Sequence, residues 1–463
     1  MSDSKHFEKN NQWYSKSFRA WVALLVILTT YHLIFLLWRI SLPLEMDRNE
    51  AWNAWHALNA FDPSQLYPKP TDLIVNNYPP LSFVLLHLFS FGDEPILVGR
   101  IISLLSIGLI AYCVADVSRS LGRNIGAASI AGAWIFGIFI IIVPIYPGMN
   151  DPNFAALAIM MTGLALFIRS CVQGETPYLA STIMVTALFF KHSIIALPIA
   201  AFVWLLMTER RLFWRSAGYF LLLGGVGLVA CSIFYGEDFL AQLLFPRTMK
   251  LTSGFRLFRV VPALVPAFVV WWQWLKTSPD RRPVLFTKIA FATTVPLNFL
   301  QQSGAGVDYN ATFEFIIVSA IALGCSLYPP DRRHSGSEKP KSDRSYALPA
   351  MVIFMIIFGN RLEPYRFVGA KYRDGVSQQV AVLKSEASRI AALPGNVACD
   401  AFIVCYYAGK KFVYDDFAMD QRVATGRWSS ELLETEIASH AIRFEKVSPL
   451  TKWQSTNFAS LLY

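Results

Sequence analysis

Carboxylates gather in the hydrophilic stretch that follows the first long apolar run. Asp47 and Glu50, in D-R-N-E, stand three positions apart and would share one face of a helix. A carboxylate at the edge of a membrane can accept a proton from a hydroxyl group or bind a cation. The spacing also fits a capping box, with Asp47 as the N-cap and Glu50 three residues on. The two interpretations are compatible.

A second acid stands in Y-P-G-M-N-D-P-N. Asp151 is the only charged residue between two apolar runs of about twenty residues. It fits a helix N-cap before Pro152, or an acid that acts on a substrate. Because two acids reach one membrane face from separate loops, we expect a shared site, in which Asp47 and Asp151 could hold a metal ion.

Basic side chains occur at the same predicted depth. Lys191 and His192 interrupt a hydrophobic stretch, where an unpaired charge costs several kcal/mol, so a partner is expected unless the lysine reaches the headgroups. Arg100 lies about one turn into the second apolar run, and Arg256 and Arg259 precede the eighth. Such cations suit an anionic phosphate at the membrane interface.

A further polar cluster opens the tenth apolar run. The sequence G-A-G-V-D-Y-N-A-T-F-E carries Asp308, Asn310 and Glu314. A turn followed by a helix cap explains these residues as well as contact with a substrate does. Asn310 also begins a glycosylation sequon, but it lies too close to the predicted span to be a good acceptor.

The composition shows which kind of scaffold must position these groups. Of 463 residues, 54% are apolar and 16% charged, against about 25% charged in soluble proteins, which excludes an ordinary soluble enzyme. The net charge of +9 arises from basic residues between apolar runs, so no nucleic-acid partner is expected. We find no zinc spacing, Walker loop or dinucleotide G-x-G-x-x-G.

The apolar runs predict a polytopic α-helical membrane protein with about eleven transmembrane helices. The predicted spans are 19–41, 96–117, 125–146, 152–168, 177–191, 193–207, 216–235, 260–275, 285–301, 312–328 and 346–360. One set of alternate loops holds eighteen Lys and Arg residues and the other seven. The richer side is therefore predicted to be cytoplasmic, with the N-terminus inside and the C-terminus outside.

This topology divides the chain into a cytoplasmic tail (1–18), a membrane domain (19–360) and an outer α/β domain (361–463). The first outer loop, 42–95, contains 78–91, which is too short to span and is predicted to lie on the membrane surface. The polar segment 329–345 is predicted to be a cytoplasmic linker.

The outer domain has the pattern of a small α/β unit. Strands are predicted at 396–398 and 411–414 and a helix at 429–440. Its two cysteines, Cys399 and Cys405, are either a disulfide or two thiols.

Six motifs, taken in order, resemble a known family. They are D-R-N-E-A-W (47–52), N-N-Y-P-P-L-S-F (76–83), G-R-I-I-S-L-L (99–105), G-M-N-D-P (148–152), K-H-S (191–193) and G-A-G-V-D-Y-N (304–310). The chain resembles the GT-C superfamily of glycosyltransferases that use polyprenyl-phosphate sugars, near the bacterial aminoarabinose transferases and protein O-mannosyltransferases. The resemblance covers about residues 18–330, and a C-terminal periplasmic α/β domain is common in that branch.

The resemblance implies an inverting hexosyl or pentosyl transferase in the bacterial inner membrane that acts on a lipid, glycan or protein acceptor at the periplasmic face. Asp47 would be the general base or a metal ligand, with Glu50 beside it, although D-R-N-E replaces the adjacent D-E of many members and leaves the principal acid open. Asp151 matches the second-loop acid and Lys191 would meet the donor phosphate. The site residues predicted in addition are His192, Arg100, Arg256 and Arg259 for the phosphate, and Tyr78, Asn150, Asp308, Asn310 and Glu314 in the substrate cavity.

Two other functions fit the same residues. A flippase for lipid-linked glycans would also need charged groups near a membrane cavity, although transporters favour repeated halves and polar groups at the midplane. A ligase that uses a diphosphate-linked donor is the other alternative. Metal dependence varies within the family and is not predicted.

Overall fold

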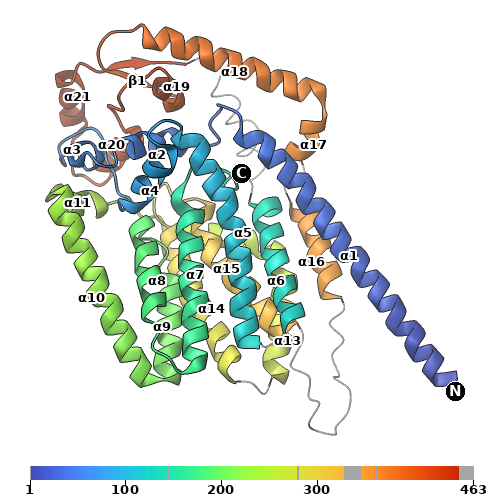
Figure 1. The fold of residues 1–463 in the computed structure, drawn as a ribbon. Helices are drawn as coiled ribbons and strands as arrows, with labels where there is room; N and C mark the ends of the chain where they lie inside the picture. The colour runs from blue at the N-terminus through green and yellow to red at the C-terminus, as the bar shows by residue number, and fades with distance from the viewer. Residues whose placement is uncertain are drawn as a thin grey trace.

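The computed structural model describes residues 2–122, 124–143, 145–278, 281–327, 346–359 and 362–447. The predicted 329–345 linker and the end of the predicted outer domain lie outside these ranges. Within them the protein is a helical bundle with a smaller domain at one end (Figure 1).

Every predicted span coincides with a helix or a run of helices, so the prediction of a polytopic membrane protein is confirmed. Among the described residues, eight such segments are long and apolar enough to cross a bilayer, and three predicted spans are shorter helices. The eight contain α1 (Ser2–Ile40), α5 (Pro95–Gly122), α6 (Ile125–Gly137) with the π-helix η1 (Ile138–Ile142), α7 (Pro152–Gln173), α10 (Arg210–Tyr235), α12 (Leu251–Gly254) with η2 (Phe255–Val260) and α13 (Val261–Thr277), α14 (Arg281–Gln302), and η3 (Tyr309–Thr312) with α15 (Phe313–Ser326). The shorter helices are α8 (Tyr178–Phe190), α9 (Ala196–Thr208) and α16 (Ala347–Phe358).

The depth of each helix follows from its side chains. Every residue of α15 is buried, and α15 packs against α5, α6, α13 and α14 at the centre of the bundle. Helix α10 lies at the edge and leaves residues such as Leu221, Val229 and Ile233 exposed. An exposed apolar helix is stable where its neighbours are lipid chains. Helix α1 begins at Ser2, so the predicted tail is largely helical.

The first loop forms short helices that lie together at one end of the bundle (Figure 1). These are α2 (Asn49–Leu58), α3 (Pro63–Leu66) and α4 (Leu81–Ser90). Helix α4 has ten residues, which is about 15 Å and half of the hydrocarbon thickness. The prediction that this segment is a helix too short to span is confirmed.

The C-terminal domain combines one small sheet with several helices. It contains α17 (Leu362–Val368), α18 (Ala370–Ala391), β1 (Val397–Cys399), α19 (Phe402–Tyr407), α20 (Asp416–Ala424), α21 (Ser430–Ser439) and β2 (Arg443–Glu445). The strands are parallel, with Val397 opposite Arg443. The strand predicted at 396–398 and the helix predicted at 429–440 are thus present, each within a residue or two.

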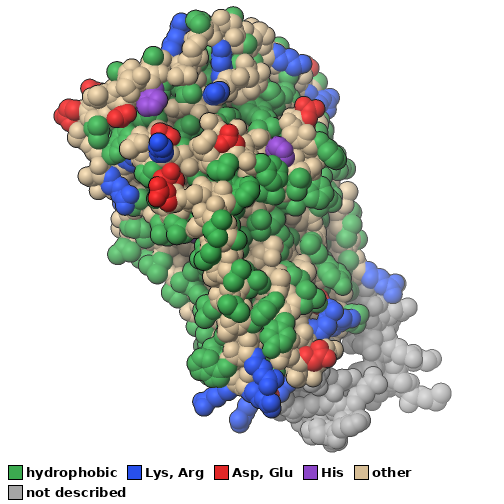
Figure 2. All heavy atoms as spheres, turned by 60° about the vertical axis from the view of Figure 1, so that its left-hand side comes forward, with side chains coloured by type: hydrophobic (Ala, Val, Ile, Leu, Met, Phe, Trp, Pro, Cys, Tyr) green, Lys and Arg blue, Asp and Glu red, His purple; other side chains and the backbone are tan. Residues whose placement is uncertain are grey.

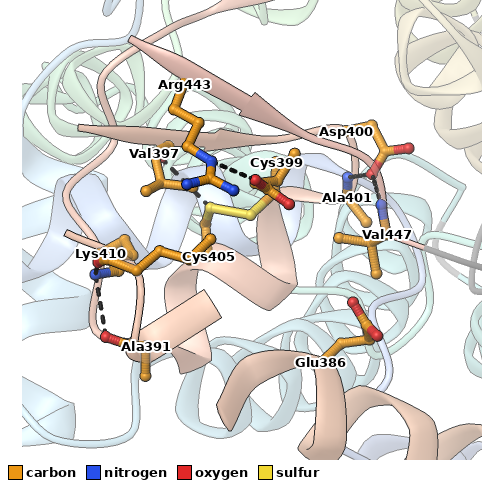
Figure 3. The surroundings of a disulfide bond; sticks show 12 residues. Glu386, Ala391, Val397, Cys399, Asp400, Ala401, Cys405, Lys410, Arg443 and Val447 are labelled. Carbon is orange, nitrogen blue, oxygen red and sulfur yellow. Dashed lines mark hydrogen bonds and ion pairs between the residues drawn. A yellow bond between two sulfur atoms is a disulfide. The ribbon is translucent and has the colours of Figure 1, made fainter. Parts of the chain in front are cut away.

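The prediction of a strand at 411–414 is wrong, because this segment pairs with no strand. It lies instead between two cavities. Cys399 and Cys405 form a disulfide that joins the end of β1 to α19 (Figure 3). Of the two alternatives, the structure therefore has the disulfide and not two free thiols.

The C-terminal domain shares its core with the first loop. Leu44, Ala51 and Ala54 are buried in one cluster with Leu383 and Val404. A second cluster joins the first loop to α20. Two segments far apart in the sequence are therefore packed together over the end of the bundle.

Charge is distributed along the long axis of the molecule. In Figure 2, apolar side chains cover the middle of the visible face, and Lys and Arg side chains gather at the end away from the C-terminal domain. This pattern agrees with a hydrocarbon-embedded middle between two polar ends.

Candidate active site

A cavity of about 370 Å³ lies between the end of the bundle and the C-terminal domain. Its walls come from α2, from several loops between helices, and from the C-terminal domain. Of the predicted site residues, Asp47, Tyr78, Asp151, Arg256, Asp308 and Asn310 line it. The tertiary structure thus brings together side chains from four separate motifs.

Asp47 lies at the entrance to α2. Its Oδ1 accepts a hydrogen bond from the Asn49 backbone N–H at 2.9 Å, and it lines the cavity. Burial, with the nearby carboxylates of Asp151, Asp308 and Glu50, outweighs the lowering effect of the Asn49 bond and raises its pKa to about 6. The N-cap position of α2 is Arg48, one residue later than predicted for Asp47.

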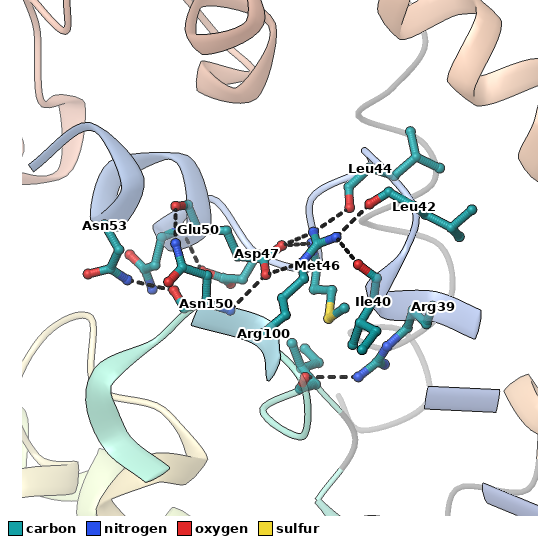
Figure 4. Close-up of polar contacts among 12 residues, drawn as sticks. Arg39, Ile40, Leu42, Leu44, Met46, Asp47, Glu50, Asn53, Arg100 and Asn150 are labelled. Carbon is teal, nitrogen blue, oxygen red and sulfur yellow. Dashed lines mark hydrogen bonds and ion pairs between the residues drawn. The ribbon is translucent and has the colours of Figure 1, made fainter. Parts of the chain in front are cut away.

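Glu50 points away from the cavity and forms a buried ion pair with Arg100 (Figure 4). Its Oε1 accepts from Arg100 Nε and from the Asn150 backbone N–H, both at 2.8 Å, and its Oε2 accepts from Arg100 Nη2 at 2.5 Å and from the Met46 N–H at 2.7 Å. This carboxylate therefore ties the start of α2 to α5 and to the second loop.

Arg100 has no donor left for a phosphate. Besides its bonds to Glu50, Nη1 donates to the carbonyl oxygens of Ile40 at 3.2 Å and Leu42 at 2.5 Å, and Nη2 donates to that of Leu44 at 2.7 Å. All five guanidinium N–H groups are thus used. Its predicted role is corrected: Arg100 holds the turn that presents Asp47.

Asp151, Lys191 and Tyr78 form a group on the membrane side of the cavity. Asp151 is the N-cap of α7 and accepts from the Asn153 N–H at 2.8 Å, so the predicted cap is present. Lys191 Nζ lies 3.8 Å from Asp151 Oδ1, donates to the Tyr78 hydroxyl at 3.3 Å and stands 4.5 Å from the Tyr78 ring centroid. The partner expected for the buried Lys191 is therefore Asp151.

The opposite wall carries the second group of charges. Arg256 lines the cavity together with Asp308, and Arg256 and Arg259 both lower the pKa of Asp308, although burial leaves that pKa raised overall. Arg259 does not line the cavity. Arg247, which no motif contains, also lines the cavity, donates to the Ala305 carbonyl oxygen at 3.3 Å and stands 5.3 Å from the Phe417 ring centroid.

Seven of the thirteen predicted residues do not line the cavity: Glu50, Arg100, Lys191 and Arg259, described above, and Glu314, Asn150 and His192. Glu314 is buried within the bundle and accepts from the Leu197 N–H at 2.9 Å and from Asn298 Nδ2 at 3.3 Å, so it joins α15 to α9 and α14. Asn150 donates through Nδ2 to the Glu50 carbonyl oxygen at 3.0 Å. His192 lines a separate apolar groove.

The glycine next to Arg100 explains how Asn150 reaches Glu50. A Cβ atom on Gly99 would lie 1.9 Å from Asn150 Oδ1. Only glycine allows α5 to approach this loop so closely.

The C-terminal domain contributes residues that the motifs did not reveal. Phe402, Phe412, Asp415 and Phe417 line the cavity. The Asp415 backbone N–H donates to the Leu73 carbonyl oxygen at 2.9 Å, and burial raises the pKa of its carboxyl to about 6. No local sequence signal marks these residues, because their role depends on a contact between segments more than 300 positions apart.

A metal ion held by Asp47 and Asp151 is one interpretation of these two acids. Among the described residues, no group of three or more His, Cys, Asp and Glu side chains is arranged to hold one. Asp151 is also paired with the Lys191 ammonium, which already supplies a positive charge beside the Asp151 carboxylate. The residues around Asp47 and Asp151 therefore do not fit a metal site.

No protein-family model and no curated protein sequence matches the chain. Among solved structures, the chain is similar to the apo-state crystal structure of ArnT from Cupriavidus metallidurans. The alignment covers 88% of this chain and 88% of the ArnT chain, with a TM-score of 0.57 and 14% sequence identity. The chain has the ArnT fold. The predicted architecture, a polytopic helical membrane domain with juxtamembrane helices and a small C-terminal α/β domain, is thereby confirmed.

The ArnT fold extends beyond the motifs of the sequence. A match over 88% of both chains includes more than the 18–330 region that carried the resemblance. At 14% identity the likeness concerns the fold, so the chemistry of this chain must be argued from its own side chains.

Proposed function

We propose that this protein transfers a sugar from a polyprenyl-phosphate donor to an acceptor hydroxyl at the outer face of a bacterial inner membrane. The observation that carries the proposal is that one cavity joins a half-buried carboxylate, Asp47, to the cations Arg247 and Arg256 and to Asp151, which pairs with the buried Lys191. ArnT, whose fold the chain shares, is an aminoarabinose transferase of the GT-C class.

The structure offers a place for the lipid part of such a donor. An apolar groove of about 380 Å³ runs between α8, α10 and α11 (Asp238–Leu243), where Gly224 and Gly225 leave room. His192 lines this groove, while its neighbour Lys191 contacts Asp151 and Tyr78 of the polar cavity. A lipid chain in the groove would place its phosphate beside Lys191.

The cavity supplies both requirements of the reaction. The acceptor O–H donates its proton to the Asp47 carboxylate as the oxygen bonds to the sugar C1 atom. The bond between C1 and the phosphate oxygen breaks, and its electron pair leaves on the polyprenyl phosphate. Lys191, Arg247 and Arg256 stabilise that charge. Attack opposite the leaving phosphate inverts C1.

The environments of Asp47 and Glu50 favour Asp47 as the principal acid. Glu50 is fully buried, and both of its oxygens accept hydrogen bonds from the protein. Asp47 faces the cavity, and its Oδ1 accepts a hydrogen bond from the Asn49 backbone N–H. A free lone pair near the substrate is what a general base needs.

The proposed orientation places the C-terminal domain in the periplasm and the N-terminus in the cytoplasm. The disulfide between Cys399 and Cys405 supports it, because disulfides persist in oxidising compartments and are rare in the cytosol. The excess of basic loop residues on the other side agrees.

Asp47→Asn tests the function. The full-length protein in nanodiscs receives polyprenyl-phosphate sugars extracted from bacterial membranes together with an envelope extract, and mass spectrometry measures polyprenyl phosphate released and glycosylated product formed. We expect the variant to lose at least about 100-fold in rate. Asp420→Asn, which changes an exposed acid of α20, is the matched control and should keep full activity.

Three outcomes contradict the proposal. Full activity of Asp47→Asn removes the assigned base. Movement of a labelled lipid-linked sugar across the bilayer of sealed proteoliposomes, without a new glycosidic bond, identifies a flippase. Release of polyprenyl diphosphate instead of the monophosphate identifies a ligase with a diphosphate-linked donor.

A further inference from the structure

A second cavity, of about 300 Å³, lies within the C-terminal domain. It is bounded by β1, by β2 and by the 411–416 segment. Arg48, Phe402 and Phe412 line both this cavity and the proposed active site, so these three side chains form the wall between them. The second cavity is therefore next to the start of α2, where Asp47 lies.

Aromatic side chains supply much of its surface. Phe412, Tyr414 and Phe444 line it, and the Tyr414 and Phe444 rings meet edge to face with centroids 5.1 Å apart. Phe444 is 53% exposed although it belongs to a strand. Exposed rings at the mouth of a cavity provide flat apolar faces for the C–H groups of a sugar ring.

The acids of this cavity are already occupied. Glu445 accepts from Arg389 at 2.8 Å and from Arg443 at 2.5 Å. Asp400 Oδ1 accepts from the backbone N–H groups of Ala401 and Val447, both at 2.9 Å (Figure 3). Their negative charge is thus satisfied within the protein.

The two lysines of the cavity have no such partner. Within the described part of the chain, Lys411 and Lys446 form no ion pair or hydrogen bond, and both are exposed. The remaining acid, Asp416, pairs with Arg48. The uncommitted charge of the cavity is therefore positive, which favours an anionic ligand.

We propose that this cavity binds an acidic sugar of the acceptor, with its carboxylate or phosphate on Lys411 and Lys446 and its ring against Phe444. This inference rests on the proposed transferase function. It makes the C-terminal domain an acceptor-binding domain rather than only a brace for the membrane helices.

The part of the wall that Arg48 forms can move at little cost. The side chains of Arg48 and Asp416 are 58% and 54% exposed, and an ion pair in water contributes little to stability. Separation of this pair would let the next unit of a bound glycan reach Asp47, the residue before Arg48.

Binding to the full-length protein in nanodiscs tests the inference without turnover. Titration calorimetry compares cellobiuronic acid with neutral cellobiose, and trehalose phosphate with neutral trehalose and with inorganic phosphate. We expect each acidic disaccharide to bind about fivefold to tenfold more tightly than its neutral counterpart. Replacing both lysines, Lys411→Met with Lys446→Met, should remove that difference.

Two further variants separate a site from general charge effects. Lys384→Met removes an exposed lysine of α18 outside the cavity and should leave binding unchanged. Phe444→Ala should weaken disaccharide binding but not the binding of inorganic phosphate. Thermal unfolding of each variant checks that it is folded.

Several results would overturn the inference. They are equal binding of acidic and neutral disaccharides, a preference for acid that survives the double lysine variant, or inorganic phosphate that binds as tightly as trehalose phosphate. Asp47→Asn should bind the disaccharides like the unaltered protein. Absence of transfer would thus refute the proposed function, whereas absence of binding in a protein active in transfer would refute this inference alone.

Discussion

The pKa of Asp47 predicts how transfer depends on pH. A general base must be ionised, and burial with three neighbouring carboxylates raises this pKa to about 6. The ionised fraction is then about nine-tenths at pH 7 and about one-tenth at pH 5, so the rate should fall nearly tenfold over this range. A carboxyl at the ordinary pKa of about 4 would stay ionised throughout.

Asp308→Asn tests the cause of this shift. The Asp308 carboxylate is one of the charges that raise the pKa of Asp47, and both residues line the same cavity. Its removal should lower that pKa and move the acidic limb of the rate profile to lower pH. Asp420→Asn, on the exposed surface of α20, should leave the limb in place.

The assay is kcat/KM for the donor, taken from initial rates of polyprenyl phosphate release between about pH 4.5 and about pH 8. This ratio reports the pKa of the substrate-free protein, which is the state to which the raised pKa of Asp47 belongs. Circular dichroism at each pH confirms that the protein is folded. A limb that stays in place in Asp308→Asn would refute the electrostatic reasoning. A limb near pH 4 in the unaltered protein would refute the raised pKa of the base.

The remaining predictions concern the groups that support the site. Lys191→Met should lower kcat by about 100-fold to 1000-fold, because a buried cation beside the leaving phosphate is lost, and Lys191→Arg should recover part of the rate. Arg100→Met should lower the free energy of unfolding by about 3–5 kcal/mol, because Glu50 is left buried without a cation, and thermal unfolding would show this. Replacing both residues of that pair with Met should cost less than replacing Arg100 alone. Replacing Cys399 and Cys405 with Ser should cost about 2 kcal/mol, since the disulfide closes a loop of about seven residues, and reductant should then have no further effect on the melting temperature.

The sequence was sufficient for features that depend on local chemistry. An apolar run of about twenty residues must lie in hydrocarbon as a helix, and the spans were therefore predictable one by one. The cap at Asp151 was predictable because Asp followed by Pro starts a helix whatever surrounds it. The cost of an unpaired charge in hydrocarbon predicted that Lys191 has a partner. The sequence did not identify that partner.

The predictions that were wrong or incomplete depended on distant contacts. Residues 411–414 have the composition of a strand, yet β1 pairs with β2, and the segment became a wall between two cavities. Arg100 has the charge to hold a phosphate, but the turn after α1 supplies carbonyl oxygens that take its donors. Residue type does not reveal which acceptors the fold brings near.

Asp47 and Glu50 show most clearly which features followed from the sequence and which from the tertiary structure. The sequence by itself determined that two acids stand at the end of the first span, three positions apart, at a membrane surface. Only the tertiary structure decided that Glu50 is neutralised by Arg100 in the interior while Asp47 faces the cavity. It also decided that a domain more than 300 residues away covers that cavity. The reason is physical: hydropathy and capping act between neighbours in the chain, whereas burial and charge pairing depend on whichever segments the packed helices bring together.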